Sequence, residues 1–284
     1  MYVIRAASRA RWTSSLIAAL AGVFGLLALL LLTASTPSAS ASSPNGPKPT
    51  VVLVHGAWAD SSGWSEVIRR LQKDDYRVLA PANPLRSLDG DAAYLSSVLA
   101  QEQGPFVLVG HSYGGAVITN AAAGNPSVNA LVYINGFVPD IGEDILHLAG
   151  EGSLAPTSIE VKAIHVPPLG PTDFDVYIKT ASFHETFAGD LSTKDAAVLA
   201  VTQRPIALDA AAGATFATAW RTIPSWYLLS RQDRTITPAA QRFMADRAGS
   251  ETVEVNSSHL SIVSQPRAVV DLIEKAAAEV ADDE

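Results

Sequence analysis

The chain has 284 residues, of which 48% are hydrophobic, 17% charged and 7% aromatic, a composition typical of a globular protein with one large core. Its 20 basic and 28 acidic residues give a net charge of −8, which argues against a surface that binds nucleic-acid phosphates. The sequence contains no cysteine, so a disulfide framework, a thiolate nucleophile and Cys-ligated zinc or iron–sulfur sites are excluded.

Residues 1–41 have the three zones of a secretory signal peptide. Three arginines precede an apolar run over residues 16–32, and the small residues that follow end in Ala39-Ser40-Ala41, a pattern that signal peptidase cleaves. We expect cleavage and a secreted protein with a net charge of −11 and no stable membrane partner. An uncleaved membrane anchor is the alternative, since about 20 apolar residues span a bilayer. The prolines of residues 42–49 predict a linker.

From residue 50 onward, short apolar segments alternate with segments of helical spacing, which predicts one α/β domain over residues 50–284. Its sheet is expected to be mostly parallel, with helices on both faces, because the strands are apolar throughout. The expected strands are Val51–Val54, Arg77–Ala80, Phe106–Val109, Ala130–Ile134, Ser225–Leu229 and Thr252–Val255. The expected helices are Gly63–Lys73, Ala92–Gln103, Gly114–Ala123, Pro238–Ala248 and Arg267–Val280.

The alternation is interrupted once, between the fourth and fifth strands. We expect residues from about 137 to 222 to form a helical cap insertion over the site. Its clustered aromatic side chains could enclose an apolar substrate group or simply pack the cap against the sheet; they are Phe137, Phe174, Tyr177, Phe183, Phe187, Phe216 and Trp220.

The segment Gly110-His-Ser-Tyr-Gly-Gly115 lies between a predicted buried strand and a predicted helix. It matches G-x-S-x-G, in which the serine occupies a strained strand-to-helix turn and acts as a nucleophile, so Ser112 is the predicted nucleophile. A phosphate-binding loop is the competing interpretation of these glycines. Ala116 stands where such a loop needs lysine, and we therefore expect no nucleotide cofactor.

The segment His55-Gly-Ala-Trp58 follows the first predicted strand. A loop at this place presents a backbone N–H toward the nucleophile, so the N–H groups of Ala57 and Tyr113 are the predicted oxyanion donors. A simple tight turn is the alternative. We expect His55 to be structural, because a histidine at a strand end usually hydrogen-bonds the neighbouring loop.

A serine nucleophile needs a base, and the base needs a carboxylate that orients it. Asp233 follows the fifth predicted strand and His259 follows the last one, which matches the chain order of serine, acid and histidine. Asp140 is the alternative acid, and a surface position is the alternative for His259. His184-Glu185 begins like a zinc-protease helix, but the second histidine is missing, so we expect no catalytic metal.

With these segments the sequence resembles the α/β hydrolase superfamily, in particular its branch of plant-type methylesterases, hydroxynitrile lyases and bacterial esterase relatives. The resemblance implies an α/β hydrolase fold, a triad of Ser112, Asp233 and His259, and oxyanion donors at Ala57 and Tyr113, in agreement with the residues themselves. The lyases carry a lysine after the catalytic histidine and a threonine in the first loop. Leu260 and Gly56 stand there in this chain, which argues against cyanohydrin cleavage.

The sequence therefore predicts a secreted serine hydrolase that cleaves small carboxylic esters through an acyl-enzyme, without metal or cofactor. Three alternatives remain open at this point. A cofactor-free haloperoxidase or an acyltransferase could use the same triad, and a non-catalytic ligand receptor could use the same fold.

Overall fold

The computed structural model describes residues 48–164 and 173–281, which belong to one compact unit spanning Asn45–Glu284. The predicted signal peptide at residues 1–41 and most of the linker at residues 42–49 lie outside the described residues, so export stays a prediction. None of the helices in the described ranges is long and apolar enough to cross a membrane.

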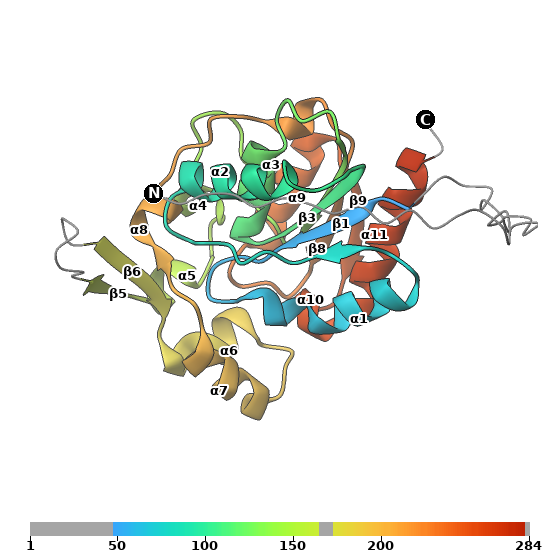
Figure 1. Cartoon of the computed structure of the whole chain (residues 1–284). Helices are drawn as coiled ribbons and strands as arrows, with labels where there is room; N and C mark the ends of the chain where they lie inside the picture. The colour runs from blue at the N-terminus through green and yellow to red at the C-terminus, as the bar shows by residue number, and fades with distance from the viewer. Residues whose placement is uncertain (1–47, 165–172, 282–284) are drawn as a thin grey trace, which may run out of the picture. The chain divides into compact units, whose positions relative to one another are not determined.

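A six-stranded parallel sheet forms the centre of this unit, in the order β2-β1-β3-β4-β8-β9 (Figure 1). Its strands are β1 (Thr50–Val54), β2 (Val78–Leu79), β3 (Phe106–His111), β4 (Val128–Ile134), β8 (Ser225–Ser230) and β9 (Glu251–Val255). All six overlap the predicted strands. The predicted fold class is confirmed.

Side chains from alternate positions of β1, β3, β4 and β8 enter two separate cores. Val52 and Val54 of β1 face one core, which they share with α2 (Leu88–Leu99), α3 (Tyr113–Ala121) and α9 (Pro238–Ala248). Val51 and Leu53 face the other, which they share with α1 (Ser65–Lys73), the short helices η1 (Ser61–Trp64) and α10 (Ser261–Ser264), and α11 (Pro266–Ala281). Burial on both faces explains why these four strands are mostly apolar, whereas the edge strand β9 is largely exposed and carries Glu251 and Glu254, so the expectation of apolar strands fails there.

Helix α2 differs most from its predicted range, beginning at Leu88 instead of Ala92. The hydroxyl of Ser87 accepts a hydrogen bond from the N–H of Gly90 and caps the helix. The prediction used the spacing of apolar residues, which begins later in the chain, whereas the capping hydrogen bond determines where the helix begins.

The cap insertion occupies residues 135–224, between β4 and β8. It contains helices, as predicted, and also an antiparallel sheet in the order β5-β6-β7. Its elements are α4 (Ile145–Leu148), α5 (Ala155–Ser158), β5 (Ile159–Ile164), β6 (Asp173–Ile178), α6 (Thr180–Phe187), α7 (Thr193–Thr202), β7 (Ile206–Ala207), α8 (Leu208–Ala211) and η2 (Ala219–Arg221). Charged residues interrupt β5 and β6 because these strands are only partly buried, which weakens their sequence signal.

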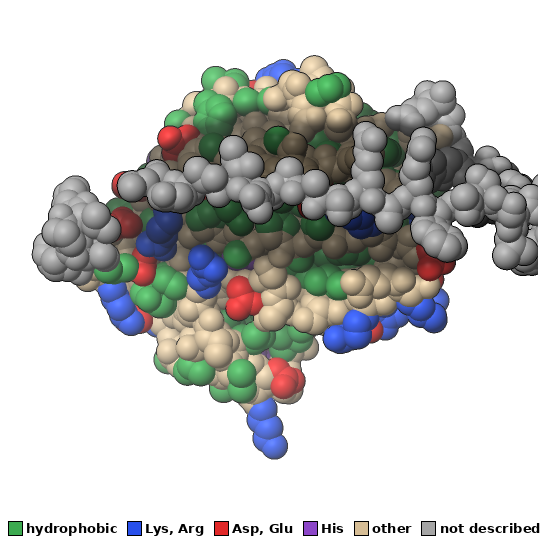
Figure 2. All heavy atoms as spheres, viewed as in Figure 1, with side chains coloured by type: hydrophobic (Ala, Val, Ile, Leu, Met, Phe, Trp, Pro, Cys, Tyr) green, Lys and Arg blue, Asp and Glu red, His purple; other side chains and the backbone are tan. Residues whose placement is uncertain are grey.

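Basic and acidic side chains are interspersed over the face of the described residues seen in Figure 2. Many basic and acidic side chains of the described residues form exposed ion pairs, for example Arg69 with Glu66 and Arg234 with Glu185. Such exposed pairs add little stability, so the apolar cores carry most of the folding free energy.

Candidate active site

Ser112 lies in the sharp turn between β3 and α3, with backbone angles φ 54° and ψ −125°. A positive φ is unfavourable for any residue with a Cβ, so the predicted strain at this position is present in the structure. The turn also depends on close backbone packing, since a Cβ added to Gly110 would lie 2.6 Å from the carbonyl oxygen of Gly114. These contacts hold Ser112 at the carboxyl end of a central strand, where ligand sites of parallel sheets form.

The loop after β1 packs directly against Ser112. A Cβ added to Gly56 would lie 2.5 Å from the Cβ of Ser112, so only glycine permits this approach. His55 anchors the loop: the N–H of Asn83 donates to its Nε2 at 3.0 Å, which leaves the ring proton on Nδ1 to donate to the Gly56 carbonyl at 2.9 Å. Burial lowers the pKa of His55 and keeps the ring neutral, in the structural role expected for it.

This anchor sets the direction of the next backbone N–H. In a trans peptide the carbonyl and the N–H point in opposite directions, so the N–H of Ala57 is turned away from the ring that holds the Gly56 carbonyl. Tyr113 is the first residue of α3, and its N–H has no acceptor within the helix. One predicted oxyanion donor thus belongs to the loop after β1 and the other to the turn between β3 and α3, and these two segments pack against each other at Ser112.

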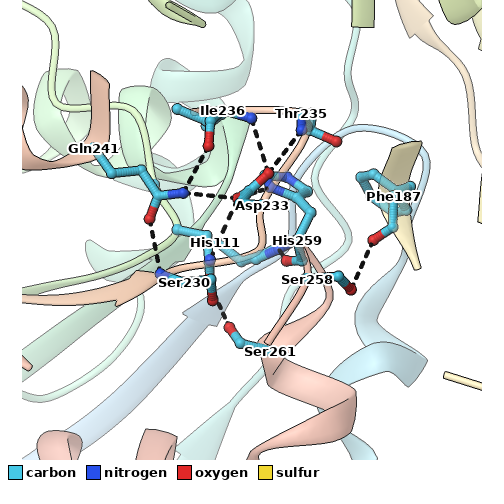
Figure 3. A network of polar contacts seen from close by, with 12 residues as sticks. His111, Phe187, Ser230, Asp233, Thr235, Ile236, Gln241, Ser258, His259 and Ser261 are labelled. Atoms are coloured by element: carbon cyan, nitrogen blue, oxygen red, sulfur yellow. Dashed lines mark hydrogen bonds and ion pairs between the residues drawn. The ribbon is translucent and has the colours of Figure 1, made fainter. Parts of the chain in front are cut away.

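Asp233 and His259 form a fully buried pair, with Nδ1 of His259 donating to Oδ2 of Asp233 at 2.6 Å (Figure 3). The other oxygen, Oδ1, accepts the N–H groups of Thr235 at 2.7 Å and Ile236 at 2.9 Å. The side-chain amide of Gln241 also donates to Oδ2, at 2.8 Å. A carboxylate surrounded by N–H donors is a strong acceptor, and it holds the proton of His259 on Nδ1.

Nε2 of His259, the nitrogen that would serve as the base, is buried and has no hydrogen-bond partner among the described residues. The ring lies against the nucleophile turn, with its centroid 5.0 Å from that of His111, the neighbour of Ser112. His111 also donates from Nε2 to the carbonyl of His259 at 2.9 Å. Burial lowers the pKa of His111 well below its ordinary value, so this ring is neutral. The described contacts thus join the acid and the base, while the Ser112 to His259 hydrogen bond is not made.

Two further residues, Asn135 and Gln241, position this pair and were not among the predicted site residues. Asn135 follows β4 with a φ of 45°, donates to Asp233 at 3.4 Å and accepts the hydroxyl of Ser261. An asparagine directly after a buried strand is a signal that could have found it. Gln241 gives no such signal, because it is one polar residue among many on an amphipathic helix.

The alternative site residues lie in other surroundings. Asp140 pairs with Arg221 at 2.6 Å, and His147 pairs with Asp144 at 2.8 Å on the surface. His184 bonds the carbonyl of Leu191 at 3.0 Å. Within residues 48–164 and 173–281, no three metal-ligating side chains come together in a group that could hold a metal ion.

A cavity of about 230 Å³ opens beside Ser112. The first loop contributes Ala57 and Trp58 to its wall, and the cap insertion contributes apolar residues that include Phe137, Val176 and Ile206. Ser112 and Thr235 supply the polar side chains of the described lining, and the Thr235 hydroxyl is already bonded to the Thr186 carbonyl. Of the clustered cap aromatics, Phe137 lines the cavity, whereas Phe183 and Phe187 of α6 pack against α7 and Leu260.

The sequence profile of the alpha/beta hydrolase family matches residues 51–272. The chain belongs to this family. The predicted family resemblance is thereby confirmed, and the match spans the cap insertion and all five predicted site residues.

Named relatives of this chain include esterases and other hydrolases. The carbendazim hydrolyzing esterase of Nocardioides sp. (strain SG-4G) is 36% identical over 34% of this chain, but the match spans less than half of that relative, 46%. The alpha/beta hydrolase nvfD of Aspergillus novofumigatus is 27% identical over 82% of this chain and 98% of its own length. These matches support the assignment of the chain to the carboxylesterase-like hydrolases.

Among solved structures, polyneuridine aldehyde esterase superposes with a TM-score of 0.70 at 19% identity. The superposition covers 81% of this chain and 99% of that esterase. At this level of identity the likeness concerns the fold.

Proposed function

We propose that this protein hydrolyses neutral carboxylic esters through an acyl-enzyme on Ser112. The buried bond between Asp233 and His259 carries the proposal, because it fixes the proton on Nδ1 and leaves the lone pair of Nε2 free to accept one. The pair lies against the turn that holds the strained Ser112.

In the proposed reaction, a rotation of the Ser112 side chain brings Oγ to Nε2 of His259. Oγ attacks the ester carbonyl while Nε2 takes its proton, and the N–H groups of Ala57 and Tyr113 donate to the oxyanion. His259 then protonates the departing alcohol, which leaves the acyl group on Ser112. A water molecule, deprotonated by His259, releases the acid and restores the serine.

The wall of the cavity supports a neutral, apolar substrate group. None of the described residues that line it is charged, and a carboxylate or ammonium placed there would lose its hydration without a partner. The volume exceeds the roughly 150 Å³ of an engineered cavity that binds benzene, so a ring or a short alkyl chain fits.

Turnover of p-nitrophenyl butyrate by Ser112→Ala tests the proposal. We expect kcat to fall by about 10⁴- to 10⁶-fold with the fold intact, because the covalent step is lost. Ser225→Ala is the matched control: Ser225 is a buried serine that bonds the Ser250 hydroxyl at the far end of β8, and its loss should leave kcat unchanged.

A fluorophosphonate probe adds a readout independent of turnover. In the wild-type protein, Oγ of Ser112 should attack the phosphorus of the probe, displace fluoride and form a phosphonate ester, whereas Ser112→Ala should remain unlabelled. Unchanged turnover by Ser112→Ala, or labelling of another residue, would overturn the assignment.

A further inference from the structure

Trp58, the residue after the proposed oxyanion donor Ala57, has a φ of 59°. A positive φ is rare for residues other than glycine and is a clear outlier for a bulky one. Such a conformation persists only where the surroundings hold it, and it concentrates at functional sites. The contacts of Trp58 therefore decide what it does.

Two hydrogen bonds hold Trp58, and both acceptors belong to the cap insertion. Its backbone N–H donates to the carbonyl of Arg204 at 2.8 Å, and its indole Nε1–H donates to the carbonyl of Val176 in β6 at 2.9 Å. The indole also meets Phe187 edge to face, with centroids 5.8 Å apart, and Phe187 lies 4.9 Å from the ring of His259. The loop after β1 is thus tied to three separate parts of the cap insertion.

Ala57 lies between two anchors of different origin. On one side, the Gly56 carbonyl is held by His55 and the Gly56 backbone packs on Ser112. On the other side, Trp58 is held by the cap insertion. Because each peptide unit is planar, fixing both neighbours fixes the direction of the Ala57 N–H.

We infer that Trp58 is a positioning residue that couples the cap insertion to the oxyanion hole by holding the Ala57 N–H in place. The inference rests on the proposed ester hydrolysis. An oxyanion donor stabilises the transition state more than the bound substrate, so its misplacement lowers kcat and leaves KM nearly unchanged. A residue that only stabilised the fold could lower the active fraction and hence the apparent kcat, but it would not weaken the binding of a transition-state analogue to the enzyme that remains folded.

Trp58→Phe is the direct test, since phenylalanine keeps an aromatic ring and removes the indole N–H. Trp220→Phe is the matched control, because the indole of Trp220 is buried and donates to the Pro139 carbonyl at the same 2.9 Å. We expect Trp58→Phe to lower kcat on p-nitrophenyl butyrate by roughly 10- to 100-fold, less than the loss of a whole donor, with KM within about twofold. Trp220→Phe should have the kcat and the KM of the wild-type protein.

A trifluoromethyl ketone inhibitor provides the second readout. Ser112 adds to its carbonyl and forms an oxyanion, so Trp58→Phe should weaken its binding by about the same factor as kcat, whereas Trp220→Phe should not. Equal kcat and equal inhibitor binding in the two variants would overturn the inference. If Ser112→Ala is inactive in the same experiment, the proposed hydrolysis survives that result; an active Ser112→Ala would overturn the hydrolysis itself.

Trp58→Gly keeps the inference testable should Trp58→Phe fail to fold. Glycine adopts a positive φ without strain, so this variant relieves the backbone while it removes the indole contacts. We expect its kcat to fall at least as far as that of Trp58→Phe. A Trp58→Gly variant with wild-type kcat would show that Trp58 does not position the oxyanion hole.

Discussion

Asp233 shows how much of the proposed chemistry depends on the partners of a single side chain. Its carboxylate receives N–H donors from the backbone of its own loop, from α9, from the end of β4 and from His259. Each donor restrains the rotamer of the side chain, so the carboxylate is held in one orientation when it accepts the N–H of the imidazole.

Asp233→Asn should therefore lower kcat by about 10⁴-fold, because an amide that presents its N–H₂ to His259 favours the wrong tautomer of the ring. Steady-state kinetics on p-nitrophenyl butyrate measure the effect. Asp140→Asn is the control, since Asp140 pairs with Arg221 on the surface and should be dispensable. The opposite result, an inactive Asp140→Asn and an active Asp233→Asn, would identify Asp140 as the acid of the triad.

At the scale of elements, the site depends on how closely α3 approaches β1. A Cβ at Gly114, in the first turn of α3, would collide with the backbone carbonyl of Val54 at the end of β1. Backbone atoms cannot move aside as the end of a side chain can, so helix and strand would have to separate.

Gly114→Ala should accordingly lower the free energy of unfolding by about 1–3 kcal/mol and reduce activity, because the separation displaces Ser112 from the first loop. Urea unfolding measures the first effect. Gly189→Ala is the matched control: the nearest atom to a Cβ there, the His184 carbonyl oxygen, is 3.7 Å away. Equal unfolding free energies for the two variants would contradict the close approach.

At the scale of the whole molecule, His55 and His111 make stability depend on pH. Both are buried at the carboxyl ends of the neighbouring strands β1 and β3, and burial lowers the pKa of each below its ordinary value of 6.5. Below that pH the unfolded chain binds protons that the folded protein does not, so the free energy of unfolding falls as pH decreases from 6.5 toward the folded pKa.

The expected slope is up to about 1.4 kcal/mol per pH unit for each ring. Urea unfolding of the wild type and of His111→Gln between pH 7.5 and 5.5 measures the share of His111. Glutamine retains an N–H donor for the carbonyl of His259 but does not titrate, so the variant should lose less stability on acidification. If the free energy of unfolding of the two proteins changed equally with pH, the result would argue against a neutral buried His111.

Local chemistry explains which features were predictable from the sequence. Short apolar or β-branched segments forecast all six strands of the central sheet, and burial on both faces explains the apolar sequences of β1, β3, β4 and β8. The nucleophile turn at Ser112 was recognisable because its glycines and its serine are close together in the chain and form one motif. The cap sheet was not recognisable, because partly buried strands admit charged residues.

The sequence by itself thus determined the fold class, the turn that carries Ser112 and the chain order of the candidate acid and base. Tertiary structure alone decided that Gln241 of α9 holds Asp233, and that the indole of Trp58 donates to a carbonyl 118 residues away. The reason is that strand burial and turn geometry act between neighbours in the chain, where composition reveals them. A hydrogen bond between distant segments depends on where folding brings each backbone, and no local pattern encodes that.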